Sequence, residues 1–391
     1  MGGVAAWPRI FCYPRLLAAG RAAGTPPPPL DRSGVELYLR AATALWHGVS
    51  LLRTRPGRTI LLPAYHCGLE LDVLVQAGYR VAFYPVGRDL AIDLDALRRF
   101  EPSDIGALYV IHYFGMPQPM AALRALCDER DWELIEDCAQ AVFAVADGRP
   151  VGSWGDIAII SFAKALPVPL GGALVVNGRE PGRSPATVAA PRGLVALAAF
   201  DLVGRDLARL PLLDLAPNRR YLQWVARGVR GALGRLRDDD GRGEARGAND
   251  VAGAIEFRAA WRDARMPAFC LALLRRISSD DVVARRRANF AALLAASADG
   301  RDVVPLLRSL PDGACPGYFP VTTTGGAQRF IAHCRERGIE PVRMWSRTPA
   351  PLPVDAFPDV AWLKREVVML PVHQDLEPAE IARLQACIVA A

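Results

Sequence analysis

An acid and a primary amine each follow an apolar, strand-like run in the stretch from Trp132 to Asn177. The run ELIE comes directly before Asp137, and the run DIAIIS comes shortly before Lys164. Reactive groups in an open parallel sheet lie just beyond the carboxyl ends of the strands. We therefore expect Asp137 and Lys164 to project into one crevice, a combination that favours a cofactor held as a Schiff base.

The rarity of lysine in this chain supports a special role for Lys164. Of the 47 Lys and Arg residues only two are lysine, Lys164 and Lys364. A chain that uses arginine wherever a positive charge suffices should keep lysine where a primary amine is needed, because a guanidinium cannot form a Schiff base. The alternative is that Lys164 is a leftover surface charge, which is what we expect of Lys364.

Several motifs in a fixed order resemble one known family. IEDCAQA is followed by G-x-P-V-G-S-W-G-D, SFAK and GGALVVN; PGRTILLPAYHCG and HYFG lie before them, and RRRANF and LPVHQDL after them. This order, spanning roughly residues 30 to 385, resembles the DegT/DnrJ/StrS family of aminotransferases that depend on pyridoxal 5'-phosphate (PLP) and act on sugars. The string KALPVPLGG is similar to a branch of that family with a shorter loop.

The resemblance implies an α/β fold of the fold type I PLP-enzyme (aspartate aminotransferase-like) class. This is a three-layer sandwich with a mostly parallel sheet, joined to a small C-terminal α+β domain. It also implies that Lys164 carries PLP, that Asp137 contacts the pyridine nitrogen, and that Gln140 faces the phenolic oxygen of the ring. A carboxylate at the pyridine nitrogen keeps it protonated, so that the ring can accept electrons. Ser161 is expected to donate to the phosphate.

The resemblance places the rest of the phosphate site at a helix start near Ala42 and Thr43. Free N–H groups at a helix N-terminus, together with a hydroxyl, can hold a dianionic phosphate. Relatives usually have glycine where this chain has Ala42, which allows a less close approach of the backbone. An ordinary helix interior is the alternative.

Three further positions depart from the pattern or leave two readings open. Relatives commonly have an aromatic ring over the cofactor where this chain has Cys67, so Tyr65 or His66 would have to supply the stacking face; Tyr65 could equally pack in the core. His112 could bind the cofactor or substrate, or could anchor the turn before Gly115. Leu170 stands where the shorter-loop branch usually has an acid.

The reaction implied by the resemblance moves an amino group from glutamate or glutamine to a keto acceptor. The expected acceptor is a nucleotide-linked keto sugar, in the synthesis of a polysaccharide or a secondary metabolite. A homodimer is the expected assembly. A related dehydratase would be expected to have lost Lys164, and a carbon–sulfur lyase would need a mobile cysteine. A catalytically idle binding or regulatory protein is the third alternative.

Composition narrows the class of protein. No run reaches the ~18 apolar residues of a membrane span, and the first 24 residues make a poor secretory signal, so a cytoplasmic protein is expected. The eight cysteines include no C-x-x-C pair and no metal-ligand spacing, which predicts reduced thiols and no metal site. A charge of +6 would suit an anionic substrate, although an Arg-biased composition also explains it. No nucleic-acid-binding module is recognisable.

The sequence predicts three regions. Residues 1–30 form an extended segment, 31–250 a large PLP-binding domain, and 251–391 connecting helices and the small domain. Within the large domain, residues 178–250 include a basic amphipathic helix, which more often covers a core or a subunit interface than a membrane surface. Asp31 and Ser33 are expected to cap a helix over residues 35–52, and residues 339–345 are expected to form a strand.

Overall fold

A seven-stranded, mostly parallel sheet organises the larger part of the molecule. The computed structural model describes residues 4, 30–31, 34–101, 103–178, 188–207, 257 and 259–391. The strand order is β1-β9-β8-β5-β4-β2-β3. The strands are β1 (Val35–Tyr38), β2 (Thr59–Pro63), β3 (Arg80–Tyr84), β4 (Ile105–Ile111), β5 (Glu133–Asp137), β8 (Ile157–Ser161) and β9 (Gly172–Val176). Strands β3, β2, β4, β5 and β8 are parallel, and β9 pairs antiparallel with both β8 and β1.

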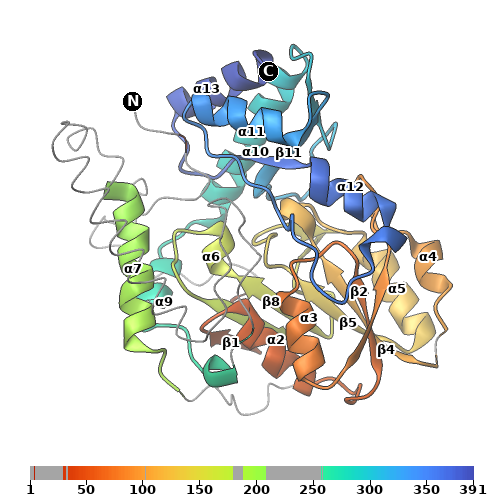
Figure 1. The fold of residues 1–391 in the computed structure, drawn as a ribbon. Coiled ribbons are helices and arrows are strands. Elements are labelled where there is room, and N and C mark those ends of the chain that lie inside the picture. The colour runs from red at the N-terminus through yellow and green to blue at the C-terminus, as the bar shows by residue number, and fades with distance from the viewer. Residues whose placement is uncertain are drawn as a thin grey trace.

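Helices lie on both faces of this sheet, as the strand order requires. The connection from β2 to β3 runs toward one edge, and the connections onward to β4 and β5 run the other way. Because such crossovers are right-handed, α3 lies on one face and α4 and α5 on the other, an arrangement that Figure 1 displays. The bounds are α2 (Ala41–Ser50), α3 (Leu69–Gln76), α4 (Leu94–Arg98), η1 (Tyr113–Gly115), α5 (Met120–Arg130), the hairpin β6 (Val145–Ala146) and β7 (Arg149–Pro150), α6 (Phe162–Ala165), α7 (Arg192–Leu207), η3 (Ala259–Trp261) and α9 (Ala268–Leu274). The three-layer fold type I class is thereby confirmed.

A second, smaller α+β unit forms the upper part of the molecule in Figure 1. It contains the antiparallel strands β10 (Val303–Pro305), β11 (Tyr318–Thr323) and β12 (Val368–Pro371), and the helices α10 (Ser279–Ser297), α11 (Ala327–Glu336) and α13 (Pro378–Val389). The segment before β12 forms η4 (Val354–Ala356) and α12 (Pro358–Glu366), which pack against the core of the large sheet. The buried side chains of the smaller unit, among them Phe290, Phe319 and Leu384, form a core separate from that of the sheet. The boundaries at residues 30 and 250 stay a prediction.

Two element predictions were wrong, and both failures have a long-range cause. The expected helix over residues 35–52 is divided: Val35–Tyr38 is a strand that pairs with β9, and the helix begins only at Ala41. The expected strand over 339–345 is reduced to isolated bridges, of Ile339 with Val4 and of Val342 with Met369. Most of the 1–30 segment and the amphipathic helix of the 178–250 region lie outside the described residues.

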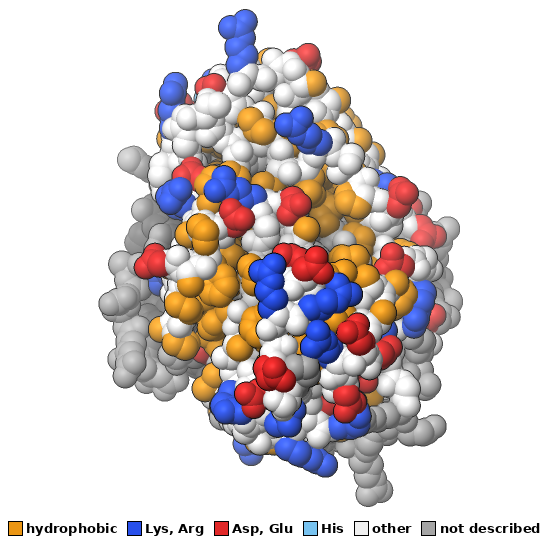
Figure 2. Space-filling view, turned by 90° about the vertical axis from the view of Figure 1, so that its right-hand side faces the viewer, with side chains coloured by type: hydrophobic (Ala, Val, Ile, Leu, Met, Phe, Trp, Pro, Cys, Tyr) orange, Lys and Arg blue, Asp and Glu red, His pale blue; other side chains and the backbone are white. Residues whose placement is uncertain are grey.

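The surface charges and the helices concern two classes of protein that the sequence does not favour, nucleic-acid-binding proteins and membrane-spanning proteins. On the face shown in Figure 2, side chains of both charge signs are interspersed with hydrophobic ones, without a continuous basic patch. Exposed ion pairs are common, such as Arg88–Asp359 at 2.8 Å, which joins the segment after β3 to α12. In the described part of the chain, no helix has the length and the apolar character needed to cross a membrane.

Candidate active site

Asp137 is the last residue of β5 and its carboxylate is held from two sides. The Tyr109 hydroxyl donates to Oδ2 at 2.7 Å, and the Ala139 N–H donates to Oδ1 at 2.8 Å. Tyr109 is fully buried, and burial together with the neighbouring Asp137 charge raises the pKa of its phenol well above the ordinary value. The phenol therefore stays a donor, and the Asp137 carboxylate keeps lone pairs for a further partner because each oxygen can accept more than one bond.

Gln140, three residues further on, has a fixed orientation and a spare donor. The N–H of Phe114 donates to Gln140 Oε1 at 2.8 Å, which identifies the oxygen of this amide. Gln140 Nε2 is buried and has no hydrogen-bond partner in the structure. A buried donor without a partner is costly. The side chain is therefore suited to an acceptor atom that comes with a ligand.

Lys164 lies on α6, the four-residue helical turn that follows β8. It is half-buried, and among the described residues its ammonium has no hydrogen bond and no ion pair. Its charge is felt by Cys67 and Glu70. Burial raises the pKa of both groups, and Lys164 lowers both, partly offsetting that rise. The amine is therefore near enough to the start of α3 for its charge to act on both groups.

The N-terminus of α2 meets the end of β9 and forms a cradle. Arg40 is the N-cap residue of α2 and its side chain makes no capping hydrogen bond to the helix; the first intrahelical bond runs from Ala44 N to Arg40 O. The helix itself therefore does not use the N–H groups of Ala42 and Thr43. A Cβ on Gly172 would lie 2.3 Å from Ala41 N, so only glycine permits this approach.

Ser161 joins this cradle because it is the register partner of Gly172 in the β8–β9 ladder. The structure therefore brings Ala42, Thr43 and Ser161 to one edge of the sheet. The helix begins at Ala41, beside the two residues that the resemblance assigned to the phosphate site; their role stays a prediction.

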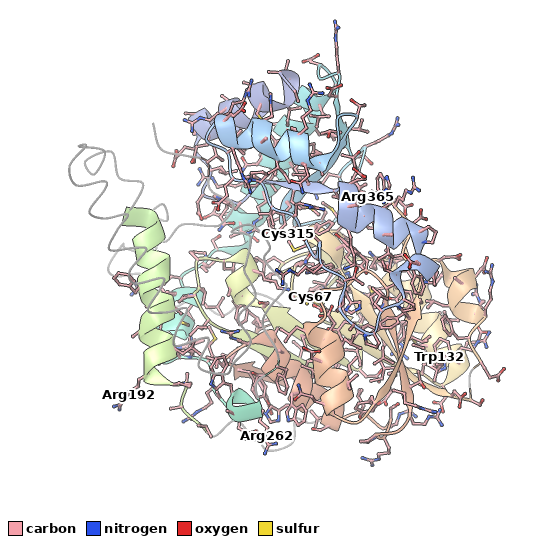
Figure 3. All side chains as sticks on the ribbon, in the orientation of Figure 1. Cys67, Trp132, Arg192, Arg262, Cys315 and Arg365 are labelled. Carbon is pink, nitrogen blue, oxygen red and sulfur yellow. The ribbon has the colours of Figure 1, made fainter. Side chains whose placement is uncertain are left out.

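Cys67 and Glu70 form a pair that the sequence analysis did not identify. The Cys67 thiol donates to Glu70 Oε2 at 2.6 Å, and the Cys67 N–H donates to Oε1 at 2.9 Å. Figure 3 shows Cys67 in the middle of the molecule, between the sheet and the small unit. Glu70 is 6% exposed, and burial followed by the nearby Asp137 charge raises its pKa.

A sequence signal for Glu70 did exist. It shares one helical face with Val73, Leu74 and Ala77, at spacings of three, four and seven residues. A carboxyl group on the apolar face of a helix must be buried with a partner. Here the partners come from Cys67.

Tyr65 packs in the core and is not placed to stack on a ligand. Its side chain is fully buried, and its ring contacts Tyr113, Phe114 and Trp345 with centroids 5.0 to 6.3 Å away. Its hydroxyl donates to the carbonyl of Met344. His66 is also buried, stacked on Phe83 at 5.6 Å. The structure thus places Tyr65 in the core and pairs Cys67 with Glu70; which residue would stack on a cofactor ring stays a prediction.

His112 also takes the structural alternative. The Gln118 N–H donates to its Nδ1 at 3.0 Å, so the ring proton is on Nε2, which donates to Glu136 Oε1 at 3.0 Å. Both nitrogens are therefore used by the protein. Glu136 in turn accepts from the N–H groups of Gly152, Trp154 and Gly155. His112, Glu136 and Cys138 lie close enough to hold a metal, but these hydrogen bonds account for their geometry.

Lys364 is not the surface charge that we expected. It is 4% exposed, and its ammonium donates to the carbonyls of Trp345, Arg347 and His66 at 2.9, 3.1 and 3.3 Å. Three carbonyls around one compact cation require lysine rather than arginine, because an ammonium is a point charge with three donors. Leu170, for its part, is buried in the main core, where an acid would be costly.

The residues at this edge fit PLP on four observations. An uncapped helix N-terminus with a glycine-dependent cradle suits the phosphate, and the partnerless Gln140 donor suits the phenolic oxygen. The Asp137 carboxylate has acceptor capacity for a protonated pyridine nitrogen. The unpaired amine of Lys164 is available for the aldehyde carbon.

Comparison with known proteins agrees with this geometry. Residues 39–183 match the model of the DegT/DnrJ/EryC1/StrS aminotransferase family. GDP-perosamine synthase of Vibrio cholerae is 30% identical over 137 residues, which are 34% of this chain and 37% of that protein. The dTDP-4-dehydro-2,3,6-trideoxy-D-glucose 4-aminotransferase of Saccharopolyspora spinosa is 32% identical over 128 residues, 32% of this chain and 33% of that one. The chain thus spans about a third of the length of the curated relatives it matches.

A solved structure shows the fold over nearly the whole chain. The putative sugar aminotransferase Spr1654 from Streptococcus pneumoniae, in its PMP form, superposes with a TM-score of 0.65 at 14% identity. The alignment covers 99% of this chain and 97% of that one. The same protein is known in a PLP form.

Proposed function

We propose that this chain, whose residues 39–183 match the DegT/DnrJ/EryC1/StrS aminotransferase family, belongs to that family and is a PLP-dependent transaminase acting on a nucleotide-linked keto sugar. The observation that carries the proposal is the unpaired amine of Lys164 at the sheet edge that also holds Asp137 and the partnerless donor of Gln140. The amino donor is glutamate or glutamine.

Each residue of the edge has a distinct task in this proposal. PLP, when bound, supplies an electron-accepting ring. The N–H groups of Ala42 and Thr43 and the Ser161 hydroxyl hold its phosphate, because a helix N-terminus favours a dianion. Gln140 Nε2 donates to the phenolic oxygen. Lys164 Nζ would hold the cofactor and would act as the general acid and base that moves a proton at the substrate carbon.

Asp137 acts together with Tyr109. The carboxylate accepts the pyridine N–H, and the Tyr109 phenol stabilises the charged form of the carboxylate by donating to Oδ2. Burial excludes water from this pair, which strengthens the interaction. This pair would therefore favour a protonated pyridine nitrogen in a bound cofactor.

The substrate class rests on the relatives and on Lys164. The two curated relatives named above are a GDP-perosamine synthase and an aminotransferase for a dTDP-linked keto sugar. A dehydratase of the same fold would be expected to lack the lysine. An idle binding protein would not be expected to keep Asp137, Gln140, Ser161 and Lys164 together at one edge. We further propose a homodimer in a reducing, cytoplasmic setting; the cysteines of the described segments are free thiols.

The test of the cofactor is an absorption spectrum of the purified protein with added PLP, before and after borohydride, beside Lys164→Ala. We expect a visible band that borohydride converts into a stable adduct on the peptide containing Lys164. Because the chain has one other lysine, Lys364→Met serves as the control and should still give the adduct. An adduct of equal yield in Lys164→Ala, or no band in the parent protein, would refute the proposal.

The same visible absorption band serves to test the reaction. Glutamate or glutamine should bleach it in a single turnover and yield the corresponding keto acid. A panel of GDP-, UDP- and dTDP-linked 4-keto and 3-keto sugars should then restore it. Bleaching without restoration by any keto sugar would leave transaminase chemistry standing and refute the sugar acceptor.

A further inference from the structure

Arg286 is a buried arginine whose guanidinium reaches the turn that carries Lys164. It lies on α10, 2% exposed, on the same helical face as Val282, Phe290 and Leu293. One of its terminal nitrogens donates to the carbonyl of Ala165, the residue next to Lys164. Its Nε donates to Gln374 Oε1 at 2.8 Å, in the loop after β12.

A third group completes the surroundings of this guanidinium. The Cys315 thiol lies against Arg286; burial raises the pKa of this thiol, and the guanidinium offsets part of the rise. Cys315 itself rests on the edge of the sheet, because its N–H donates to the Gly115 carbonyl at 3.0 Å. Gly115 has a positive φ of 93°, and a Cβ there would lie 2.0 Å from the Cys315 carbonyl oxygen.

The charge of Arg286 is satisfied in an unusual way for a buried cation. Among the described residues it forms no ion pair with a carboxylate, and its partners are a backbone carbonyl, a side-chain amide and a thiol. A buried cation without a carboxylate partner is costly. These three partners must therefore compensate for the loss of water around the guanidinium. The carbonyl of Ala165 lies at the end of the α6 turn, where partial negative charge favours a cation.

We infer that Arg286 is a positioning residue that fixes the direction of Lys164 by holding the Ala165 carbonyl against the small α+β unit. The inference rests on the proposed function. A planar fork can bond Ala165 and Gln374 at once in two directions, whereas a lysine ammonium at the end of a flexible stem cannot hold both with the same geometry. Arg286 thereby makes the position of the reacting amine depend on α10 and on the loop after β12.

The first measurement uses the protein without cofactor. Formaldehyde with cyanoborohydride methylates amines, and mass spectrometry of the Lys164 peptide gives its rate as a function of pH. We expect Arg286→Gln to raise the rate at Lys164 several-fold, because the turn loses its anchor and the amine gains access to solvent. Arg286→Lys should behave in the same way, since it cannot restore both bonds.

The second measurement is PLP affinity from the visible band. We expect the dissociation constant to rise about tenfold or more in Arg286→Gln, the range for losing a hydrogen bond from a charged group. Arg287→Gln is the matched control. This neighbour donates to the carbonyls of Pro311 and Ala314 at 3.2 and 3.0 Å. Its substitution therefore removes hydrogen bonds within the small unit and none to the turn that carries Lys164. It should leave both readouts unchanged.

Two outcomes would overturn the inference. In the first, Arg286→Gln folds but has the same methylation rate at Lys164 and the same PLP affinity as the parent protein. In the second, Arg287→Gln changes the methylation rate and the PLP affinity as much as Arg286→Gln does. If Arg286→Gln does not fold, Gln374→Leu decides instead: it removes one anchor of the guanidinium and should shift both readouts in the same direction by a smaller factor. Failure of the parent protein to bind PLP would refute the proposed function, while the methylation series would still test Arg286.

Discussion

The hydroxyl of Tyr109 and Oδ2 of Asp137 lie 2.7 Å apart across neighbouring strands β4 and β5. Tyr109→Phe removes this donor and leaves the ring, so the charged form of Asp137 loses a hydrogen bond. We expect PLP to bind about tenfold more weakly, since hydrogen bonds to charged groups contribute roughly 1.5–3 kcal/mol. A titration of the visible band measures this.

Tyr84→Phe is the control for this variant. The Tyr84 hydroxyl is equally buried and donates to the Tyr109 carbonyl at 2.8 Å, away from Asp137. Tyr84→Phe should lower the free energy of unfolding without changing the PLP affinity. Equal weakening in both variants would mean that the Asp137 contact has no part in holding the cofactor.

Glu70 should make the protein less stable as pH rises. Its pKa in the folded state is raised, first by burial and then by Asp137, so the stability it contributes is fully present below its unfolded pKa. That stability is lost as pH rises through the folded pKa. In urea unfolding from pH 4 to 8, the free energy of unfolding of Glu70→Gln should increase relative to that of the parent protein as pH rises. A difference between the two proteins that does not change with pH would contradict the raised pKa.

The stability that Glu136 contributes should depend on pH in the opposite direction. Burial alone would raise its pKa, but the His112 hydrogen bond and the backbone N–H donors outweigh burial and lower it. Its contribution is present above the unfolded pKa and is lost as pH falls through the lowered folded pKa. We expect Glu136→Gln to lose about 3 kcal/mol of unfolding free energy at pH 7, as when one partner of a buried pair is removed. A neutral effect in denaturant unfolding would show that the N–H donors are satisfied equally by an amide.

Gly172→Ala should damage the phosphate cradle. The added Cβ would lie 2.3 Å from Ala41 N and 2.4 Å from the Arg40 carbonyl carbon, which are backbone atoms and can move only with α2. We expect a stability loss of roughly 1–3 kcal/mol, typical of overpacking, and weaker binding of inorganic phosphate and of PLP. Gly193→Ala on α7 has open space around its Cβ and should change neither binding.

Lys364→Met should destabilise the protein without altering the chemistry at Lys164. The substitution keeps the length of the side chain but leaves three buried carbonyls without their donor. Each lost partner costs about 1 kcal/mol or more, so we expect roughly 3 kcal/mol in urea unfolding. Loss of borohydride labelling at Lys164 in folded Lys364→Met would instead show that the two lysines are coupled.

The strand ends were predictable because local pattern decides them. β5 ends at Asp137 and β8 at Ser161, where apolar runs of buried-strand length meet polar residues. A parallel order of strands then places these ends at one edge, whatever the details of packing. The placement of Asp137, Ser161 and Lys164 therefore followed from the sequence, while their roles stay predictions.

The missed features depend on partners far away in the chain. The side chain of Lys364 is buried because carbonyls of residues 66, 345 and 347 converge on it, which no local pattern announces. VELY alternates polar and apolar residues as a strand does, but its pairing with residues 172–175 decides against the helix. Arg286 could have been noticed as a charge on an apolar helical face, although its distant partners could not. Glu70 is different, because its partner Cys67 lies only three residues away.

The pairing of β1 with β9 also has a consequence for the order of events during synthesis. Tyr38 leaves the ribosome long before its partner Gly172 is made; at about 5–20 residues per second the delay is roughly 7 to 27 seconds. During that time the strand has no neighbour, and the start of α2 lacks the glycine against which it packs. Lys164 is synthesised just before Gly172, so its amine emerges before the cradle beside it can close.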